Sequence, residues 1–194
     1  MDYTAICGLD EAGRGALAGP IFASAVILRC SADRLVSQAP APIRDSKTLS
    51  PLQRSKLHQY LLSMPITVAL STVSADLINQ MGISWANKTI FERLIDSLNA
   101  PQYIVDGNLK LNSHKQSRVI SRVRADDDVL PVTLAGIIAK VERDNYMALI
   151  HQQHPDYGWQ QNKGYGTQAH IQALKQHGPC SYHRHIFVNT ALSR

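Results

Sequence analysis

The chain has 194 residues, of which 44% are hydrophobic and 18% charged, an ordinary composition for a folded globular protein. No apolar run approaches the about 20 residues of a membrane-spanning helix, and the N-terminus lacks the features of a secretory signal. We therefore expect a cytoplasmic protein without a membrane partner. The net charge of +5 and the pI near 9.2 favour a polyanionic partner, and three scattered cysteines exclude a disulfide framework.

Five short apolar runs predict β-strands. In chain order they cover residues 3–9, 21–28, 66–73, 103–105 and 118–123. Only a glycine-rich loop separates the first two runs, and so short a connection predicts an antiparallel pair.

The segments between and after these strands carry helix signals. Ser50 and Gln53 flank Pro51 as a capping box with proline in the first turn. The last predicted helix covers residues 167–177 and is closed by Gly178 and Pro179. Two other helices repeat apolar residues along one face: Phe91, Leu94, Ile95 and Leu98 in a helix that starts at Ser84, and Leu134, Ile137, Ile138 and Val141 in a helix that Pro155 ends.

Strands followed by alternating helices and strands predict an α/β fold in which helices flank a five-stranded mixed sheet. A chain of this length fits one domain. We assign it to residues 1–194, with a core over residues 1–155 and a helical, loop-rich extension over residues 156–194. Residues 29–43 are predicted to form a surface loop, because they contain Ser, Ala and a Pro-Ala-Pro segment.

Carboxylates follow two of the predicted strands. Asp10 and Glu11 end the first apolar run, and Asp106 ends the fourth run just before a glycine. If these two strands are parallel neighbours, Asp10 and Asp106 lie side by side. Carboxylates that close repel one another, and a bound Mg²⁺ or Mn²⁺ ion is the usual remedy. A fourth acid could come from the run Asp126-Asp127-Asp128, and spacing alone does not say which of the three it is.

The loop Gly13-Arg14-Gly15 follows the first pair of acids and offers backbone donors to a phosphate. Acids beside such a loop point to phosphoryl-transfer chemistry. A dinucleotide-binding reading of the glycines does not fit, because that motif opens a helix, whereas a strand-like run follows Pro20 here. Taken singly, each of these acids is more often a solvated residue or a helix cap than part of an active site.

Two other features have competing readings. Tyr165 stands between two glycines and just before a helix start, which is either a turn with a helix cap or a tyrosine free to stack on a sugar or base. The histidine pairs at 151/154 and 183/185 invite a zinc site. Neither pair joins a cysteine or an acid at the spacing of zinc ligands, so oxygen ligands and magnesium fit better.

Six motifs together resemble bacterial ribonuclease HII, and the resemblance spans nearly the whole chain. In chain order they are GLDEAGRG at residues 8–15, DSKTL at 45–49, VDGN at 105–108, IIAKVERD at 137–144, KGYGT at 163–167 and HR at 183–184. The resemblance implies a ribonuclease H-like fold with an added C-terminal helical portion. It also implies an endonuclease that cleaves the RNA strand of RNA–DNA hybrids and nicks duplex DNA on the 5′ side of a single embedded ribonucleotide. Such an enzyme serves ribonucleotide excision and RNA primer removal.

The resemblance also implies roles for individual residues. Asp10, Glu11 and Asp106 would be catalytic metal ligands, and counting back from Lys140 selects Asp126 as the fourth, with two Mg²⁺ or Mn²⁺ ions expected when substrate is bound. The backbone of Gly13-Arg14-Gly15 would read the ribonucleotide 2′-OH, the group that distinguishes RNA from DNA. Tyr165 would stack on the deoxyribose at the RNA–DNA junction, and Lys47 would contact a phosphate. We expect a monomer.

The chain departs from the family pattern at a few positions and leaves the metal-binding core intact. Ala16 stands where proline is usual, Ala125 and Asp127 flank Asp126 in place of Gly and Ser, and Thr133 and Gly136 replace serines. Two rival functions stay open: another ribonuclease H-like metal nuclease that acts on DNA, and an RNA–DNA binder without catalysis. The sister ribonuclease HIII typically carries an additional N-terminal domain, whereas the first predicted strand begins close to Met1.

Overall fold

The computed structural model of the protein describes residues 3–193. Its centre is a five-stranded sheet with the order β3-β2-β1-β4-β5. The strands are β1 (Ile6–Ala12), β2 (Ile21–Leu28), β3 (Ile66–Val73), β4 (Gln102–Asp106) and β5 (Val119–Arg122). β1 pairs antiparallel with β2 and parallel with β4. The sheet is therefore mixed, and the predicted antiparallel pair and the parallel pairing of the first and fourth strands are both confirmed.

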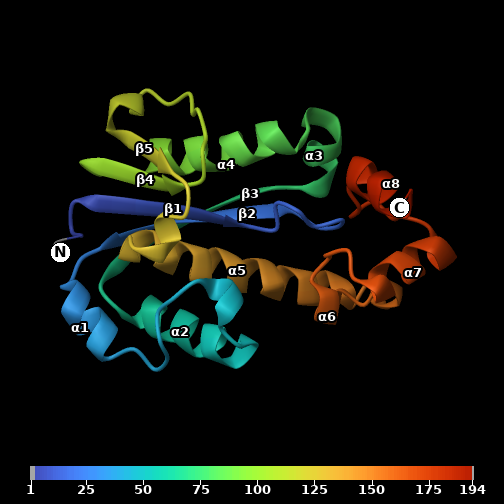
Figure 1. Cartoon of the computed structure of the whole chain (residues 1–194), viewed down its shortest axis with the longest axis horizontal. Helices are drawn as coiled ribbons and strands as arrows, with labels where there is room; N and C mark the ends of the chain where they lie inside the picture. The colour runs from blue at the N-terminus through green and yellow to red at the C-terminus, as the bar shows by residue number, and fades with distance from the viewer. Residues whose placement is uncertain (1–2, 194) are drawn as a thin grey trace.

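Helices cover both faces of this sheet (Figure 1). One face carries α3 (Ala75–Met81) and α4 (Ile83–Ser97), and the other carries the long α5 (Leu130–His151) with α1 (Ala32–Ser37) and α2 (Pro51–Ser63) outside it. The capping box at Ser50 is present as predicted, since its side chain accepts from the Gln53 backbone and the Gln53 side chain accepts from the Ser50 backbone. This arrangement confirms the predicted α/β class.

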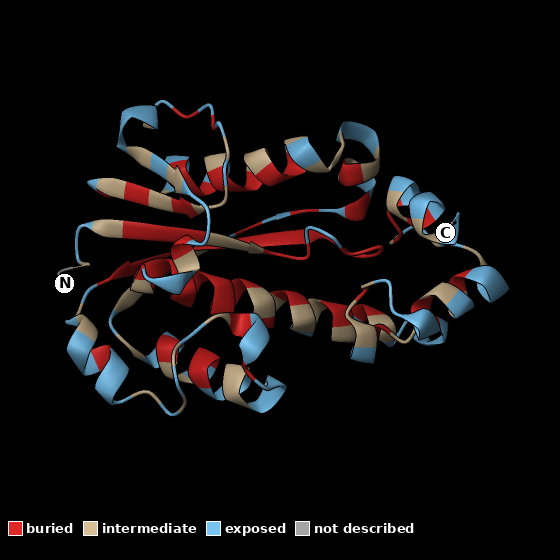
Figure 2. Ribbon diagram, viewed as in Figure 1, coloured by how far each residue is buried: buried red, intermediate tan, exposed pale blue. Residues whose placement is uncertain are grey.

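Each face of the sheet has its own apolar core, and burial follows the strands and the helix sides turned toward them (Figure 2). Between the sheet and α4, the core includes Leu9, Phe91 and Tyr103. Between the sheet and α5, it includes Val26 and Leu134. A side chain at Gly8 would lie 2.3 Å from the backbone of Pro131 and Val132, so this glycine lets the start of α5 approach β1 closely.

The C-terminal part of the chain packs against the far end of α5. It contains α6 (Trp159–Asn162), α7 (Gln168–His177) and α8 (His185–Leu192). A third apolar cluster joins these helices to the core, because it combines Trp159, Leu174 and Val188 with Met147 of α5 and with Leu17 of the glycine-rich loop. The extension is therefore attached directly to the loop that follows the first acids.

Three predictions about local structure were wrong. Strand β1 starts later than predicted and runs on through the acids, because Asp10, Glu11 and Ala12 all pair with β2. The predicted surface loop at residues 29–43 contains helix α1, which Ser31 caps and whose Leu35 is buried. The helix predicted at residues 167–177 is present as α7 but is not the last, because α8 follows it, and α3 was not predicted.

Helix α5 ends at His151, before Pro155, which begins a short 3-10 turn instead. Among the described residues, no helix combines the length and the apolar character that crossing a membrane would require.

Candidate active site

The sheet brings the first acids together. Leu9 of β1 is level with Val105 of β4 in the parallel register, so the next residues, Asp10 and Asp106, lie at neighbouring positions. Burial raises the pKa of Asp10 well above its usual range, and the carboxylates of Glu11 and Asp106 raise it further. Burial also raises the pKa of Glu11 to about 7, against the opposing effect of Arg14. These groups therefore repel one another when all are charged.

Asp126 joins this cluster through the backbone beside it. The N–H of Ala125 donates to Asp106 Oδ1 at 2.8 Å, and the Thr133 hydroxyl donates to the Asp126 carbonyl at 2.7 Å. Burial raises the pKa of Asp126, and Asp106 is the next largest cause. Asp128, in contrast, forms an ion pair with Arg122. Of the acids in this run, Asp126 is thus the one that the fold couples to Asp10 and Asp106.

A glycine on α5 makes room for Asp10. A Cβ at Gly136 would lie 2.3 Å from Asp10 Oδ2, so the carboxylate rests against the helix backbone there. The other oxygen of Asp10 accepts from the Glu11 N–H at 2.7 Å. The sequence showed Gly136 only as a departure from a family pattern, and nothing local marked its contact with an acid 126 positions earlier.

The acid cluster fits divalent cations in its chemistry. Carboxylate oxygens are the ligands that Mg²⁺ and Mn²⁺ prefer. Burial is the largest cause of the raised pKa values of Asp10 and Asp126, and repulsion from the neighbouring carboxylates adds to it. Within residues 3–193, no three acidic, histidine or cysteine side chains converge as a ready-made ligand cage. The site is therefore identified by the electrostatic coupling of the acids, in which neighbouring carboxylates raise the pKa of Asp10 and of Asp126.

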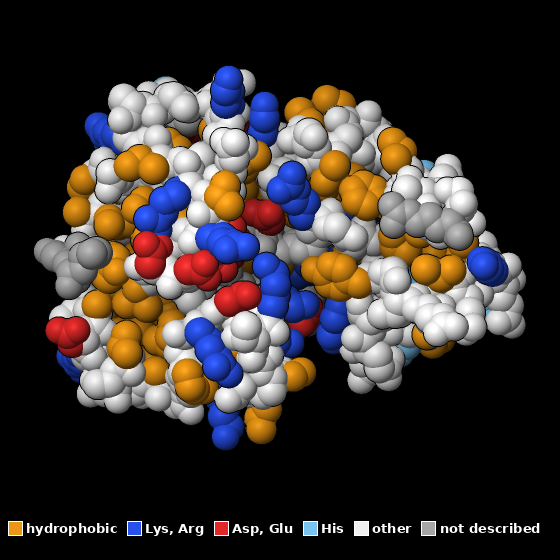
Figure 3. All heavy atoms as spheres, viewed as in Figure 1, with side chains coloured by type: hydrophobic (Ala, Val, Ile, Leu, Met, Phe, Trp, Pro, Cys, Tyr) orange, Lys and Arg blue, Asp and Glu red, His pale blue; other side chains and the backbone are white. Residues whose placement is uncertain are grey.

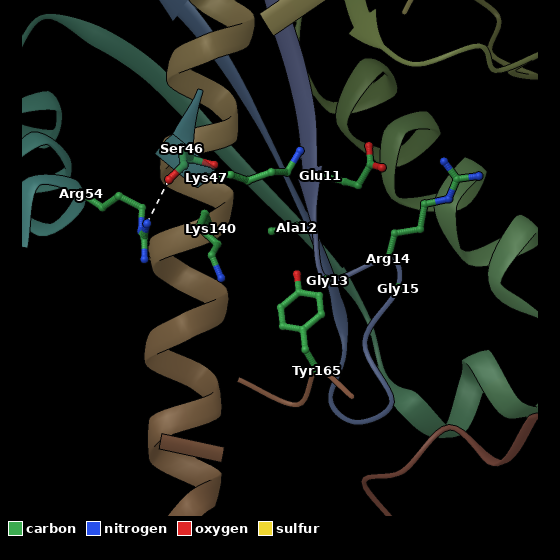
Figure 4. A pocket seen from close by; sticks show the side chains of 10 residues that line it. All are labelled: Glu11, Ala12, Gly13, Arg14, Gly15, Ser46, Lys47, Arg54, Lys140 and Tyr165. Atoms are coloured by element: carbon green, nitrogen blue, oxygen red, sulfur yellow. Dashed lines mark hydrogen bonds between the residues drawn. The ribbon is translucent and has the colours of Figure 1, made fainter. Parts of the chain in front are cut away.

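A groove with a volume of about 520 Å³ gathers most of the other predicted site residues. Gly13, Arg14 and Gly15 line one side, Lys47 another, and Tyr165 a third, with Glu11 among them. Figure 4 shows the Tyr165 ring between Lys140 and the glycine loop. On the surface, acidic side chains gather at the middle of this face with lysine and arginine around them (Figure 3).

Lys47 faces the acids from a short 3-10 turn, Ser46–Thr48. Burial by itself would lower the pKa of Lys47, but Asp45, Asp10, Asp126 and Asp106 outweigh it, so the pKa is raised. Asp45 also caps this turn, because its Oδ1 accepts from the Lys47 N–H at 3.0 Å. Lys47 therefore stays protonated beside the acid cluster, where a cation can meet a phosphate.

Two arginines that are 0% exposed hold the glycine-rich loop. Arg143 of α5 donates to the carbonyls of Pro20, Ala18 and Lys163 at 2.9–3.0 Å. Arg184 donates to the carbonyls of Gly19 and Arg14 at 2.9 Å. Both lie in motifs that supported the family resemblance, but their inward direction was not predicted. Buried guanidinium groups that bond only to backbone carbonyls fix a loop that has little regular structure of its own.

The Tyr165 turn is bonded to the same loop. The N–H groups of Leu17 and Ala18 donate to the Gly164 carbonyl at 2.8 and 3.1 Å. The Tyr165 ring lies 5.4 Å from Lys140 Nζ and 5.2 Å from the Arg143 guanidinium carbon, within the range of cation–π attraction. The two predicted recognition elements, the glycine loop and Tyr165, thus form one bonded unit.

A buried histidine pair, which sequence reasoning missed, supports Tyr165 from behind. The Tyr165 carbonyl can only accept, so His170 Nδ1, at 2.9 Å, carries the proton. His170 Nε2 then accepts from Trp159 Nε1 and from His183 Nε2, both at 3.1 Å. His183 Nδ1 in turn accepts from the Cys180 N–H at 3.0 Å. One set of neutral tautomers satisfies this whole network, which joins Tyr165 to the C-terminal helices.

Comparisons with known proteins agree with this arrangement. The family model for ribonuclease HII matches residues 7–190. A ribonuclease HII of Chlamydia muridarum is 41% identical over 187 residues, covering 95% of this chain and 82% of that protein. The solved structure of a PCNA:RNase HII complex from Archaeoglobus fulgidus matches with a TM-score of 0.77 and 26% identity, covering 92% of this chain and 91% of that one.

Another solved structure, Bst-RNase HIII in complex with Mn²⁺, matches with a TM-score of 0.70 and 16% identity, over 99% of this chain and 71% of that one. At this identity it bears on the fold alone. The family model and the bacterial relative together cover nearly all of the sheet, the acids and the C-terminal helices. The chain therefore belongs to the ribonuclease HII family and is a ribonuclease H hydrolase with a ribonuclease H-like fold.

Proposed function

We propose that this protein is an endonuclease that cleaves the RNA strand of RNA–DNA hybrids and nicks duplex DNA on the 5′ side of single embedded ribonucleotides. The observation that carries the proposal is the coupling of Asp10, Asp106 and Asp126 beside a groove that also holds the glycine loop and Tyr165. A cluster of acids is found in many phosphoryl-transfer enzymes. The glycine loop beside the acids favours an enzyme that must also recognise a 2′-OH.

The acids are proposed to hold two divalent cations, Mg²⁺ or Mn²⁺. When bound, such ions stabilise the charge of an in-line attack by water and of the departing 3′-oxygen, which leaves 5′-phosphate and 3′-hydroxyl ends. The preference of carboxylate oxygens for these ions supports the choice. All of the proposed ligands come from one chain, in keeping with action as a monomer.

The other residues select and position the substrate in this proposal. The backbone of Gly13, Arg14 and Gly15 contacts the ribonucleotide 2′-OH, and its position depends on Arg143 and Arg184, which bond to the carbonyls of the loop. Lys47 contacts a phosphate next to the acids. Tyr165 packs its ring on the sugar at the RNA–DNA junction, where two cations hold the ring from the protein side.

One gel tests the proposed substrate. A DNA duplex with a single ribonucleotide is incubated with the enzyme and Mg²⁺ or Mn²⁺, beside an all-DNA duplex of the same sequence. We expect one nick, on the 5′ side of the ribonucleotide, and no cut in the control. Cleavage of both duplexes would favour the rival DNA nuclease, and binding without cleavage would favour the non-catalytic binder.

Matched aspartate variants test the acids. Asp106→Asn and Asp126→Asn each remove one charge from the cluster, so we expect activity to fall by about a hundredfold or more. Asp128→Asn is the control, because Asp128 pairs with Arg122 and is not among the groups that raise the pKa of Asp10 or Asp126, and it should stay near wild type. Near-full activity of Asp106→Asn at millimolar Mg²⁺ would refute the assignment, and an equal loss in Asp128→Asn would leave no reason to prefer Asp126.

A further inference from the structure

A second groove opens beside the first. It has a volume of about 620 Å³ and shares Arg54, Lys140 and Tyr165 with the groove at the acids. The shared residues make the two grooves neighbours, with Tyr165 lining both. The second groove runs between the start of α2, the middle of α5 and the turn at Lys163. None of the four acids proposed as metal ligands lines it.

Three cations surround a single carboxylate in this second groove. Lys140 Nζ lies 2.7 Å from Asp144 Oδ1, and an Arg54 nitrogen lies 3.8 Å from Asp144 Oδ2. Lys163 Nζ reaches only the backbone carbonyl of Asp144, at 3.5 Å. The charges that line the groove therefore sum to +2. We call Arg54, Lys140, Lys163 and Asp144 the cation groove.

At Lys163, burial and the nearby cations together outweigh the attraction of Asp144. Burial lowers the pKa of Lys163, Asp144 opposes this, and Lys140, Arg54 and Arg143 lower it further, so the net shift is downward. The remaining polar lining, which includes the side-chain amides of Asn145, Gln160 and Gln161, supplies neutral donors and no second carboxylate. A bound anion would relieve the repulsion and accept from these donors.

The backbone at Lys163 is held in an uncommon conformation. Its φ is +52°, in the left-handed region, which is unfavourable for a residue other than glycine. The bond from Arg143 to its carbonyl, at 2.9 Å, fixes it there. The fold thus keeps a lysine where glycine or asparagine is usual at the end of a helix, which is an independent sign that the side chain has a use.

We propose that the cation groove binds a backbone phosphate of the nucleic-acid strand that continues past Tyr165, away from the cleaved bond. The inference rests on the proposed function, because a strand stacked on Tyr165 must leave the first groove through one of its ends. A phosphodiester carries one negative charge and several acceptor oxygens, which match an excess of cations with amide donors around them.

Salt dependence of binding measures this contact. The parent is Asp106→Asn, so that the substrate stays intact, and Lys163→Gln is added to it. Each lost phosphate contact reduces the slope of log Kd against log salt by about 0.9, which corresponds to roughly eightfold weaker binding at about 0.1 M salt. Lys163→Arg should restore the slope. Lys175→Gln, at an exposed position in the last turn of α7, is the matched control and should bind like the parent.

Truncated duplexes locate the contact. One duplex is shortened on the 5′ side of the ribonucleotide and another on the 3′ side. If the cation groove holds a flanking phosphate, the deficit of Lys163→Gln disappears with one of the two and persists with the other. An unchanged slope for Lys163→Gln would overturn the proposal. So would a deficit of the same size with both truncated duplexes, because Lys163 would then act at the central site.

The result separates this inference from the proposed function. If the wild-type enzyme nicks the ribonucleotide-containing duplex and Lys163→Gln leaves the slope unchanged, only the cation groove is wrong. If the wild-type enzyme does not cut any duplex, the proposed function fails whatever the slope. Urea unfolding of each variant at the same pH shows whether Lys163→Gln stays folded, and Lys163→Arg keeps the charge test valid if it does not.

Discussion

Gly13→Ala is expected to unfold this protein more readily than Gly15→Ala, although the two glycines are two residues apart. Gly13 has a φ of +89°, and a Cβ there would lie 1.8 Å from Arg143 Nε. Gly15 lacks a positive φ, and a Cβ on it would meet nothing within 4 Å. The two substitutions add the same methyl group, so their difference reports the positive φ of Gly13 and its contact with Arg143 together.

The magnitude follows from two costs. A left-handed backbone costs an alanine about 1–2 kcal/mol. The methyl group also forces Arg143 to move, and Arg143 makes three hydrogen bonds to backbone carbonyls, two in the loop and one at Lys163. A hydrogen bond from a charged group contributes about 1.5–3 kcal/mol, so the loss of one brings the total to about 3–5 kcal/mol.

Equilibrium unfolding in urea, followed by circular dichroism, measures this difference. For a chain of this size, each kcal/mol corresponds to about 2–4 °C in Tm, so Gly13→Ala should melt roughly 6–20 °C below wild type. Gly15→Ala should stay within about 1 kcal/mol of wild type. If the two variants unfold with the same free energy, Arg143 does not depend on Gly13, and the proposed support of the loop is wrong.

Three further predictions concern the support of Tyr165 and the buried side chains. His170→Asn keeps a donor near the Nδ1 position, whereas His170→Gln does not, so the asparagine variant should retain more of the preference for ribonucleotide-containing over all-DNA duplexes, measured as a ratio of kcat/KM. Equal ratios in two folded variants would contradict the bond from His170 to Tyr165. Burial and His170 lower the pKa of His183 to about 4. Below about pH 6.5 the unfolded chain therefore binds more protons than the folded one, and the free energy of unfolding should fall between pH 6.5 and 4. His183→Gln should flatten this fall and His185→Gln, at an exposed position, should not; an unchanged profile in His183→Gln would exclude His183 as its cause. Burial raises the pKa of Cys7 to about 12, so iodoacetamide should label Cys30 and Cys180 in the native protein well before Cys7, as read by mass spectrometry, and early labelling of Cys7 would refute its burial.

Local signals were sufficient for much of the fold. The second and third strands have the predicted bounds, residues 21–28 and 66–73, because each is a continuous, largely apolar run. β2 is buried along its whole length, whereas β3 is mostly half-buried. The capping box at Ser50 and the glycine at the end of α7 were also read directly from the sequence. These features depend on neighbours within four residues, so a local pattern carries them.

Features that depend on a distant partner were missed or misplaced. β1 extends to Ala12 because β2 is long enough to pair with it there, and nothing within residues 3–12 states that length. Helices α1 and α8 are short, and tertiary contacts rather than a long periodic pattern hold them. The wrong prediction of a loop at residues 29–43 has the same cause, because Leu35 of α1 packs into the apolar core between the sheet and α5.

The sequence by itself determined the family, the α/β class and the presence of acids at the ends of two strands. The resemblance selected Asp126 from the run 126–128, whereas only the tertiary structure shows what holds this segment beside Asp106, because the Ala125 N–H bonds to Asp106 across 19 residues. The tertiary structure also turned Arg143 and Arg184 inward to carbonyls 123–170 positions away. A sequence pattern records which side chains a segment carries, but the partner of a buried polar group is chosen by the packing of the whole chain.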